Sequence, residues 1–155
     1  IVEKNQVVNY IHYSYKDKST KILEPEKDEW ELVFCQYYTI LYTDDGIATP
    51  YYVRGALLNP NGVSAALDTL THFDEIDYNL ASGIEYSAKP DTIGHDWKSV
   101  TVDEGSNAAE YKVRLGQTYL LKDINGEIYK IRFISFLGET GVKGFPSFEY
   151  KKLEP

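Results

Sequence analysis

The sequence predicts an all-β protein, built of antiparallel sheets with a C-terminal hairpin and at most one or two short helices. Composition is the first reason: 14 Tyr, 6 Phe and 2 Trp accompany many Val, Ile and Thr residues, and these side chains pack well on a pleated surface. The second is a hairpin with defined turn chemistry near the C-terminus. A chain of 155 residues is the size of one domain and buries roughly 70% of its unfolded surface. We therefore expect one domain over residues 1–155 that needs no disulfide or metal to fold.

The hairpin occupies residues 119–136, where two runs of strand-forming residues flank one turn. Residues 123–126, Asp-Ile-Asn-Gly, suit a type I turn whose last residue takes the left-handed conformation that glycine adopts without steric cost. This register separates an apolar face from a basic face: the first holds Tyr119, Leu121, Tyr129, Ile131 and Phe133, and the second Lys122, Lys130 and Arg132. A two-residue Asn-Gly loop would shift the pairing by one residue and mix lysine into the apolar face. The hairpin predicts a scaffold and supplies no nucleophile, base or metal ligand set.

Other segments have the alternation or the apolar character of strands, namely residues 7–15, 30–42, 51–58 and 110–115. Turn residues follow two of them, Asp44-Asp45-Gly46 and Asn59-Pro60-Asn61-Gly62. Residues 63–70 fit either a strand or a short helix. Residues 71–74 resemble a capping box ahead of one helical turn at 75–80. The segment 82–107 is the least regular.

Charge and motifs argue against several function classes. The formal net charge of −8 repels phosphate backbones and anionic lipid headgroups, so we expect no nucleic-acid partner. No phosphate-binding loop, zinc motif or nucleophile elbow is present, and the carboxylates are dispersed along the chain, so we expect no enzyme, no catalytic residue and no metal site. No apolar run is long enough to span a bilayer.

Two further observations concern the start of the chain and its cysteine. The sequence opens at Ile1 with neither an initiator Met nor a charged n-region, which favours a processed or trimmed product. Cys35 is the only cysteine and lies in an apolar strand-like run, so we expect a small, buried and inert side chain rather than a nucleophile.

The histidines are His12, His72 and His95, which are far apart in sequence, so any shared site would depend on the fold. Residues 91–98, Asp-Thr-Ile-Gly-His-Asp-Trp-Lys, bring a glycine, an imidazole, a carboxylate and an indole together in one loop. Asp96 is placed to orient the imidazole of His95. Trp97 suits either of two roles, covering a flat ligand or anchoring the loop in the core, and the second is the commoner for tryptophan.

Three segments together resemble the HmuY family: Trp30-Glu-Leu-Val-Phe-Cys-Gln-Tyr37, Ile93-Gly-His-Asp-Trp-Lys98, and residues 119–136 followed by Gly144-Phe-Pro-Ser-Phe-Glu-Tyr150. The resemblance runs from about residue 10 to residue 153. It implies a small, largely β lipoprotein of a Gram-negative bacterium, at the cell surface or the periplasmic face of the outer membrane, held by a lipid anchor outside this chain. The best-known members are haemophores, which hold haem between β-arms through two axial side chains and pass it to a TonB-dependent outer-membrane receptor.

The same resemblance implies candidate haem residues. His95 and His72 are the candidate axial ligands, while Asp103 and Glu104 stand where the haem-binding type has a histidine after its tryptophan. The chain has no methionine, so ligation by two methionines is excluded, whereas a single histidine or a tyrosinate remains chemically open. Haem propionates need basic neighbours, and Lys89, Lys98 and Trp97 are candidates for the rim of the site.

A second hypothesis uses the same scaffold without haem. An accessory surface lipoprotein would pack against an outer-membrane transporter or secretion complex through an exposed aromatic patch, because tyrosine is enriched at interfaces. The candidate residues are Tyr37, Tyr38, Tyr42, Tyr51 and Tyr52. These tyrosines equally suit a half-buried sheet face.

Overall fold

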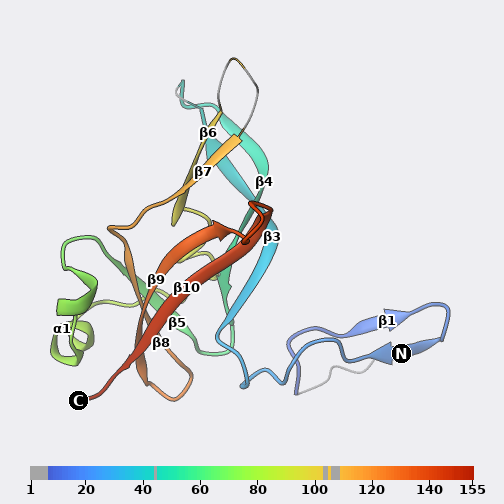
Figure 1. Ribbon diagram of the computed structural model, residues 1–155. Helices are drawn as coiled ribbons and strands as arrows, with labels where there is room; N and C mark the ends of the chain where they lie inside the picture. The colour runs from blue at the N-terminus through green and yellow to red at the C-terminus, as the bar shows by residue number, and fades with distance from the viewer. Residues whose placement is uncertain (1–6, 44, 103–104, 106–108) are drawn as a thin grey trace.

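The computed structural model describes residues 7–43, 45–102, 105 and 109–155, and it confirms the all-β class (Figure 1). Its two helical segments are short: the 3₁₀ turn η1 spans Phe73–Glu75 and the helix α1 spans Tyr78–Ser82. The strands, in chain order, are β1 (His12–Ser14), β2 (Ser19–Lys21), β3 (Leu32–Tyr42), β4 (Ala48–Leu58), β5 (Ser64–Asp68), β6 (Lys98–Val102), β7 (Ala109–Val113), β8 (Thr118–Lys122), β9 (Ile128–Leu137) and β10 (Lys143–Leu153). None of the helices in these residues is long and apolar enough to cross a membrane.

A four-stranded antiparallel sheet in the order β10-β9-β8-β5 forms the body of the protein. The predicted hairpin is its centre, with Tyr119 opposite Ile131 and Leu121 opposite Tyr129. Gly126 has a φ of +82°, and its N–H donates to the carbonyl of Asp123 over 3.1 Å. The turn type and the register predicted from the sequence are therefore confirmed.

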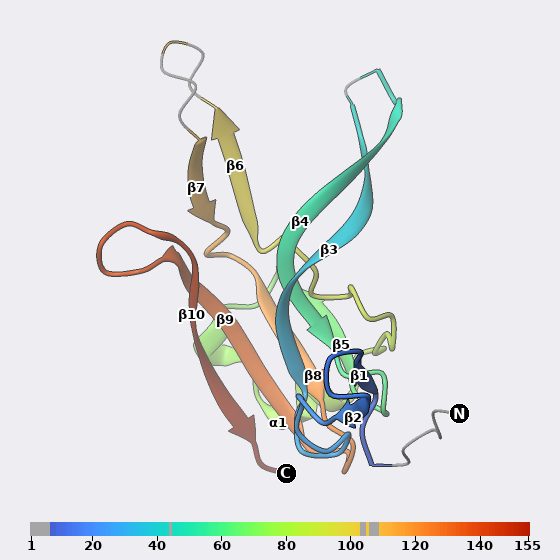
Figure 2. The same cartoon turned by 90° about the vertical axis from the view of Figure 1, so that its right-hand side faces the viewer.

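Two long hairpins rise from one end of this body and diverge, as Figure 2 shows. One, here the first arm, pairs β3 with β4 over eleven residues of each strand, and the other, the second arm, pairs β6 with β7. The arms approach one another at their base, where Ala56 and Gly94 exchange two backbone hydrogen bonds of 2.9 Å. A Cβ on Gly55 would lie only 2.1 Å from the carbonyl oxygen of Gly94, so this contact requires glycine.

One face of the central sheet packs beneath the arms. Tyr119, Leu121, Ile131 and Phe133 lie in a core cluster with Trp97, whose indole stacks on the Phe133 ring at a centroid distance of 4.1 Å. The apolar face predicted for the hairpin is thus the face that supports the arms.

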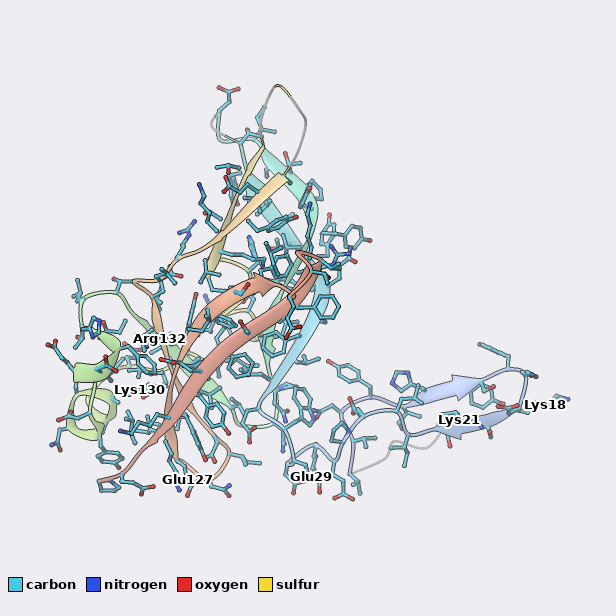
Figure 3. The ribbon with its side chains drawn as sticks, viewed as in Figure 1. Lys18, Lys21, Glu29, Glu127, Lys130 and Arg132 are labelled. Carbon is cyan, nitrogen blue, oxygen red and sulfur yellow. The ribbon has the colours of Figure 1, made fainter. Side chains whose placement is uncertain are left out.

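The opposite face of the hairpin is covered as well. Leu120 and Ile128 pack against α1, and Lys130 is only 3% exposed. The Lys130 ammonium donates to the carbonyls of Phe73 and Ile76 at 2.6 and 2.8 Å, beside the helical segment (Figure 3). Burial lowers the pKa of Lys130. This basic face therefore fastens η1 and α1 to the sheet instead of lying in solvent.

Some sequence-based boundaries differ from the structure. The strand expected over residues 7–15 is only His12–Ser14, paired with β2 in a hairpin that extends from the body (Figure 1). Residues 63–70 contain the strand β5 rather than a helix. The segment 82–107, expected to be irregular, contains the strand β6. This strand forms by pairing with β7, which begins seven residues after β6 ends.

The predicted capping box is wrong. The backbone N–H of Asp74 donates to the ring of His72 over 3.4 Å, and the N–H of Leu80 donates to the carboxylate of Asp77 over 2.9 Å. Each helical segment therefore has its own N-cap side chain, and the run divides into η1 and α1 instead of one helical turn at 75–80.

Candidate functional site

The principal cleft opens where the two arms diverge. A cavity of about 420 Å³ lies between the arms. It is lined by residues of β4, by His95, and by Lys98, Val100 and Tyr111 of the second arm. A neighbouring cavity of about 410 Å³ lies between the first arm and the start of β10. The two cavities share Gln36, Arg54 and Phe136 in their linings, so they are adjacent, and together they are here called the arm cleft.

The charge of the arm cleft is opposite to that of the protein. Its lining includes the basic residues Arg54, Lys98 and Lys143, together with His95, and no Asp or Glu is among the described residues that line it. The chain as a whole carries a formal charge of −8. Since like charges repel, an anionic ligand is favoured in this cleft over the rest of the surface.

His95 owes its position to the glycine before it. Gly94 has a φ of +60°, and its backbone pairing with Ala56 fixes the loop at the base of the arms. The His95 side chain, 24% exposed, then points toward the first arm, where Nδ1 lies 3.1 Å from the Tyr37 hydroxyl. Its Nε2 lies 3.4 Å from a carboxylate oxygen of Asp96, a side chain that is 73% exposed.

Tyr37 is a neutral partner for this imidazole. Burial, with the nearby carboxylates of Asp91 and Asp96, raises the pKa of Tyr37 to about 12. Two imidazole tautomers satisfy the contact, because a phenol both donates and accepts. When Nε2 carries the proton, it faces the Asp96 carboxylate and Nδ1 accepts from Tyr37. When Nδ1 carries the proton, Nε2 has the lone pair that binds a metal, and the exposed Asp96 carboxylate must turn away from it.

Lys98 lies at the floor of the arm cleft and not at its rim. The side chain is largely buried, its ammonium donates to the carbonyl of Arg54, and it lies 4.3 Å from the centroid of the Trp97 ring. Burial lowers the pKa of Lys98 to about 8, with Asp96 acting in the opposite direction. The ammonium therefore ties β4 to β6 at the point where the arms separate.

Trp97 anchors its loop in the core, which is the commoner of the two roles that the sequence suggested. It is 1% exposed and stacked on Phe133, and its indole Nε1 is buried without a hydrogen-bond partner. Its edge lines the part of the arm cleft next to β10. Trp97 is thus part of the floor and does not lie over the open face of the cleft.

The remaining sequence candidates lie elsewhere. His72 is 66% exposed at the start of η1, beside Asp74, and does not line the arm cleft. Lys89 is exposed and does not line it either. Asp103 and Glu104 lie outside the described residues. The fold thus brings His95 together with Lys98 and Trp97 but not with His72 or Lys89.

The five candidate tyrosines divide between two environments. Tyr51 and Tyr52 line the arm cleft, and Tyr37 faces His95. Tyr38 packs edge-on against Tyr52 at 5.7 Å and is 56% exposed, and Tyr42, near the tip of the first arm, is 73% exposed. The tyrosines therefore do not form one uniform patch.

Cys35 is half-buried and lines the part of the arm cleft next to β10, so the expectation of full burial is wrong. Burial still raises the pKa of its thiol, which disfavours the nucleophilic thiolate. No group of three or more His, Cys, Asp or Glu side chains in the described part of the chain is placed to hold a metal ion.

Sequence reasoning missed several residues of the cleft. Arg54 lies on β4 at the base of the first arm, Tyr111 pairs opposite Val100 on the second arm, and Lys143 begins β10. Only the pairing of β6 with β7 brings Tyr111 to this cleft, and no local motif marks that pairing. Of these residues, Arg54 was the easiest to identify from the sequence, because it is the single charged residue of its strand.

A sequence profile of the family described as HmuY protein matches residues 4–150, and no curated protein matches the chain. Three similar crystal structures are each 17% identical in sequence. A proposed lipoprotein of Bacteroides fragilis has a TM-score of 0.40 over 75% of this chain and 77% of that one. Apo PinO of a Porphyromonas species has 0.45 over 93% and 79%, and a proposed HmuY-like haem-binding protein of Bacteroides vulgatus has 0.36 over 90% and 82%. Because the profile covers nearly its whole length, the chain belongs to the HmuY family.

Proposed function

We propose that this protein binds haem in the arm cleft, with His95 as an axial ligand of the iron. The observation that carries the proposal is the position of His95, whose imidazole lies at a cleft that is lined by aromatic and basic side chains and by no described carboxylate. Aromatic walls suit the flat face of a porphyrin, and basic groups suit its two propionates.

The side chains that line the arm cleft suit haem. Tyr51, Tyr52 and Tyr111 supply flat apolar surface, while Arg54 and Lys143 supply cations outside the buried floor. Tyr37 holds Nδ1 of His95, and Nε2 would serve a metal once the exposed Asp96 carboxylate beside it turns away. Haem bound here would supply an iron that accepts nitrogen or oxygen ligands in its axial positions.

The second axial position has fewer candidates than the sequence suggested. His72 does not line the arm cleft, and the chain has no methionine. We infer that a tyrosine of the cleft, or water, would hold the iron together with His95. Such a site binds haem less tightly than a pair of histidines does, because only one ligand is a strong nitrogen donor.

A haemin titration followed by the Soret band tests the proposal. The parent protein should show a saturable shift, and His95→Ala should lose most of it. His72→Ala is the matched control, since it removes an imidazole that does not line the cleft, and its titration should equal that of the parent. If haemin binds the His95→Ala variant as it binds the parent, His95 is not a ligand, and if the parent does not bind haemin, haem is not the cargo.

We further propose that the protein acts outside the cytoplasm as a lipid-anchored surface carrier, passing haem to a TonB-dependent outer-membrane receptor. Family membership supports an extracytoplasmic protein, and the two arms that border the cleft diverge away from the body (Figure 2). Mixing the haem-loaded protein with the purified apo-receptor should move the Soret signal to the receptor faster than free dissociation allows.

A second candidate function is an accessory lipoprotein that packs against an outer-membrane transporter or secretion complex. The observation that favours it is the exposure of Tyr38 and Tyr42 along the first arm. Failure of the parent to bind haemin, together with co-purification with a transporter that is lost in Tyr38→Ser, would support this function instead.

A further inference from the structure

A third cavity lies on the other side of Phe34 from the arm cleft. Its volume is about 430 Å³, and it lies between the segment that enters β3 and the strands β9 and β10. Five aromatic side chains line it, which are Trp30, Phe34, Tyr129, Phe148 and Tyr150. We call it the aromatic groove. Its size lies within the range of small-molecule sites, roughly 300–1,000 Å³.

The aromatic groove differs from the arm cleft in charge. Glu29 and Glu31 are its only charged lining residues in the described part of the chain, and no Lys, Arg or His lines it. Phe34 lines both spaces and stacks on Phe148 at a centroid distance of 5.5 Å. Phe34 therefore lies between a basic cleft and an acidic groove, and Phe148 packs on it from the groove.

Contacts within the protein hold one wall of the groove, and further rings lie beside it. The Tyr129 hydroxyl donates to Glu127 over 2.9 Å, and the Lys152 ammonium holds the same carboxylate at 2.6 Å. Tyr150 lies 6.5 Å from Tyr129 and 6.4 Å from Phe148, centroid to centroid. Preorganised rings lose little conformational entropy when a ligand binds.

The entrance side is also fixed. The buried side chain of Asn59 donates to the carbonyl of Trp30 over 2.6 Å, which holds the backbone beside Glu29 and Glu31. Figure 3 shows Glu29 at the end of the body where the chain enters from the N-terminal hairpin, the same end as Glu127. The carboxylates are therefore presented at the edge of an aromatic wall.

We propose that the aromatic groove binds a small organic cation with an apolar surface, of the tetraalkylammonium class. The faces of Trp, Tyr and Phe rings attract a cation through their quadrupole, with energies of about 0.5–2 kcal/mol for each favourable contact. The methyl groups of such a cation bury apolar area, and Glu29 and Glu31 balance its charge. This site and its ligand are independent of haem, because only Phe34 is shared with the arm cleft.

Choline and its neutral isostere 3,3-dimethylbutan-1-ol form the test pair, because a tert-butyl group replaces the trimethylammonium group with nearly the same shape. The readout is the indole N–H resonance of Trp30 in the haem-free protein, followed by NMR. Choline should shift this resonance to saturation, and the isostere should bind about tenfold more weakly or worse, the equivalent of about 1.4 kcal/mol. The indole of Trp97, in the core below the arm cleft, serves as an internal reference.

Three variants refine the assignment. Glu29→Gln combined with Glu31→Gln should weaken choline binding severalfold without altering the rings, and Tyr150→Leu should weaken it by removing one aromatic face. Glu139→Gln is the control, since it removes an exposed carboxylate that does not line the groove. Equal binding of choline and its isostere would show an apolar site that does not recognise charge, and a Trp30 resonance that stays unmoved by choline would overturn the proposal.

Discussion

The hydroxyl of Tyr37 and Nδ1 of His95 lie 3.1 Å apart, although 58 residues separate them in sequence. Tyr37 belongs to the first arm, and His95 belongs to the loop that leads into the second. Their contact therefore links the first arm to the loop that leads into the second arm, and it fixes the orientation of the imidazole ring.

Replacing Tyr37 by Phe removes this hydroxyl and keeps the ring. Because a hydrogen-bonded partner orients a metal-binding imidazole, we expect haemin affinity to fall by about tenfold in the variant. Tyr38→Phe is the matched control, since Tyr38 is the next residue of β3 and packs on Tyr52 instead of His95. Soret titrations of the three proteins measure the effect, and equal affinity for parent and Tyr37→Phe would contradict the proposed role.

Lys98 predicts a pH dependence of stability. Its pKa is about 8 in the folded protein and 10.5 in its ordinary state, so between these values the unfolded chain binds more protons than the native one. Stability due to this group therefore rises with pH through that window. In urea titrations, the free energy of unfolding of the parent should rise relative to that of Lys98→Met between about pH 8 and about pH 10.5.

The exposed Lys151 provides the control for this measurement. Lys151→Met should follow the parent in parallel over the same pH range. A Lys98→Met curve that also stays parallel to the parent would show that burial of the ammonium in the floor does not govern its protonation.

Gly55 predicts a steric effect at the base of the arms. Gly55→Ala would place a Cβ 2.1 Å from the carbonyl oxygen of Gly94, so the arms must shift apart. We expect a loss of about 3 kcal/mol in unfolding free energy, in the upper range of overpacking effects. Gly116→Ala meets no atom within 4 Å and should cost almost nothing, and comparable losses in the two variants would exclude the steric explanation.

Gly126 predicts a conformational effect without a steric one. Its φ is +82°, and a Cβ there would meet no atom within 4 Å. Gly126→Val should therefore cost about 1 to 2 kcal/mol through backbone strain alone. Thermal or urea unfolding measures the loss, with Gly116→Val, where the φ is not in the left-handed region, as the unstrained comparison.

We expect the Cys35 thiol to react slowly with alkylating reagents in the folded protein. Its thiol pKa is raised by burial, and it lines the arm cleft next to β10. Labelling by a maleimide should be slower than for a free cysteine and should accelerate on unfolding, and bound haemin should slow it further. Rapid stoichiometric labelling of the native, haemin-loaded protein would place the thiol outside the occupied cleft.

Local chemistry in the sequence was sufficient for the central sheet. The turn at residues 123–126 contains its own determinants, since Gly126 supplies the positive φ and Asp123 accepts the backbone N–H groups of Asn125 and Glu127. The register that follows from this turn separates Tyr119 and Ile131 from Lys130 without any long-range information. The all-β class follows from the strand-forming composition, and the family resemblance rests on short segments of sequence.

The arm cleft was decided by tertiary structure. The sequence singled out His95 because glycine, carboxylate and indole surround it locally, but its partner Tyr37 and the cleft residues Arg54, Tyr111 and Lys143 come from other strands. It placed Lys98 at a rim, whereas packing against Trp97 and the Arg54 carbonyl places that ammonium in the floor. The physical reason is that strand pairing over long sequence separations determines which side chains meet, and a single local pattern contains no record of those pairings.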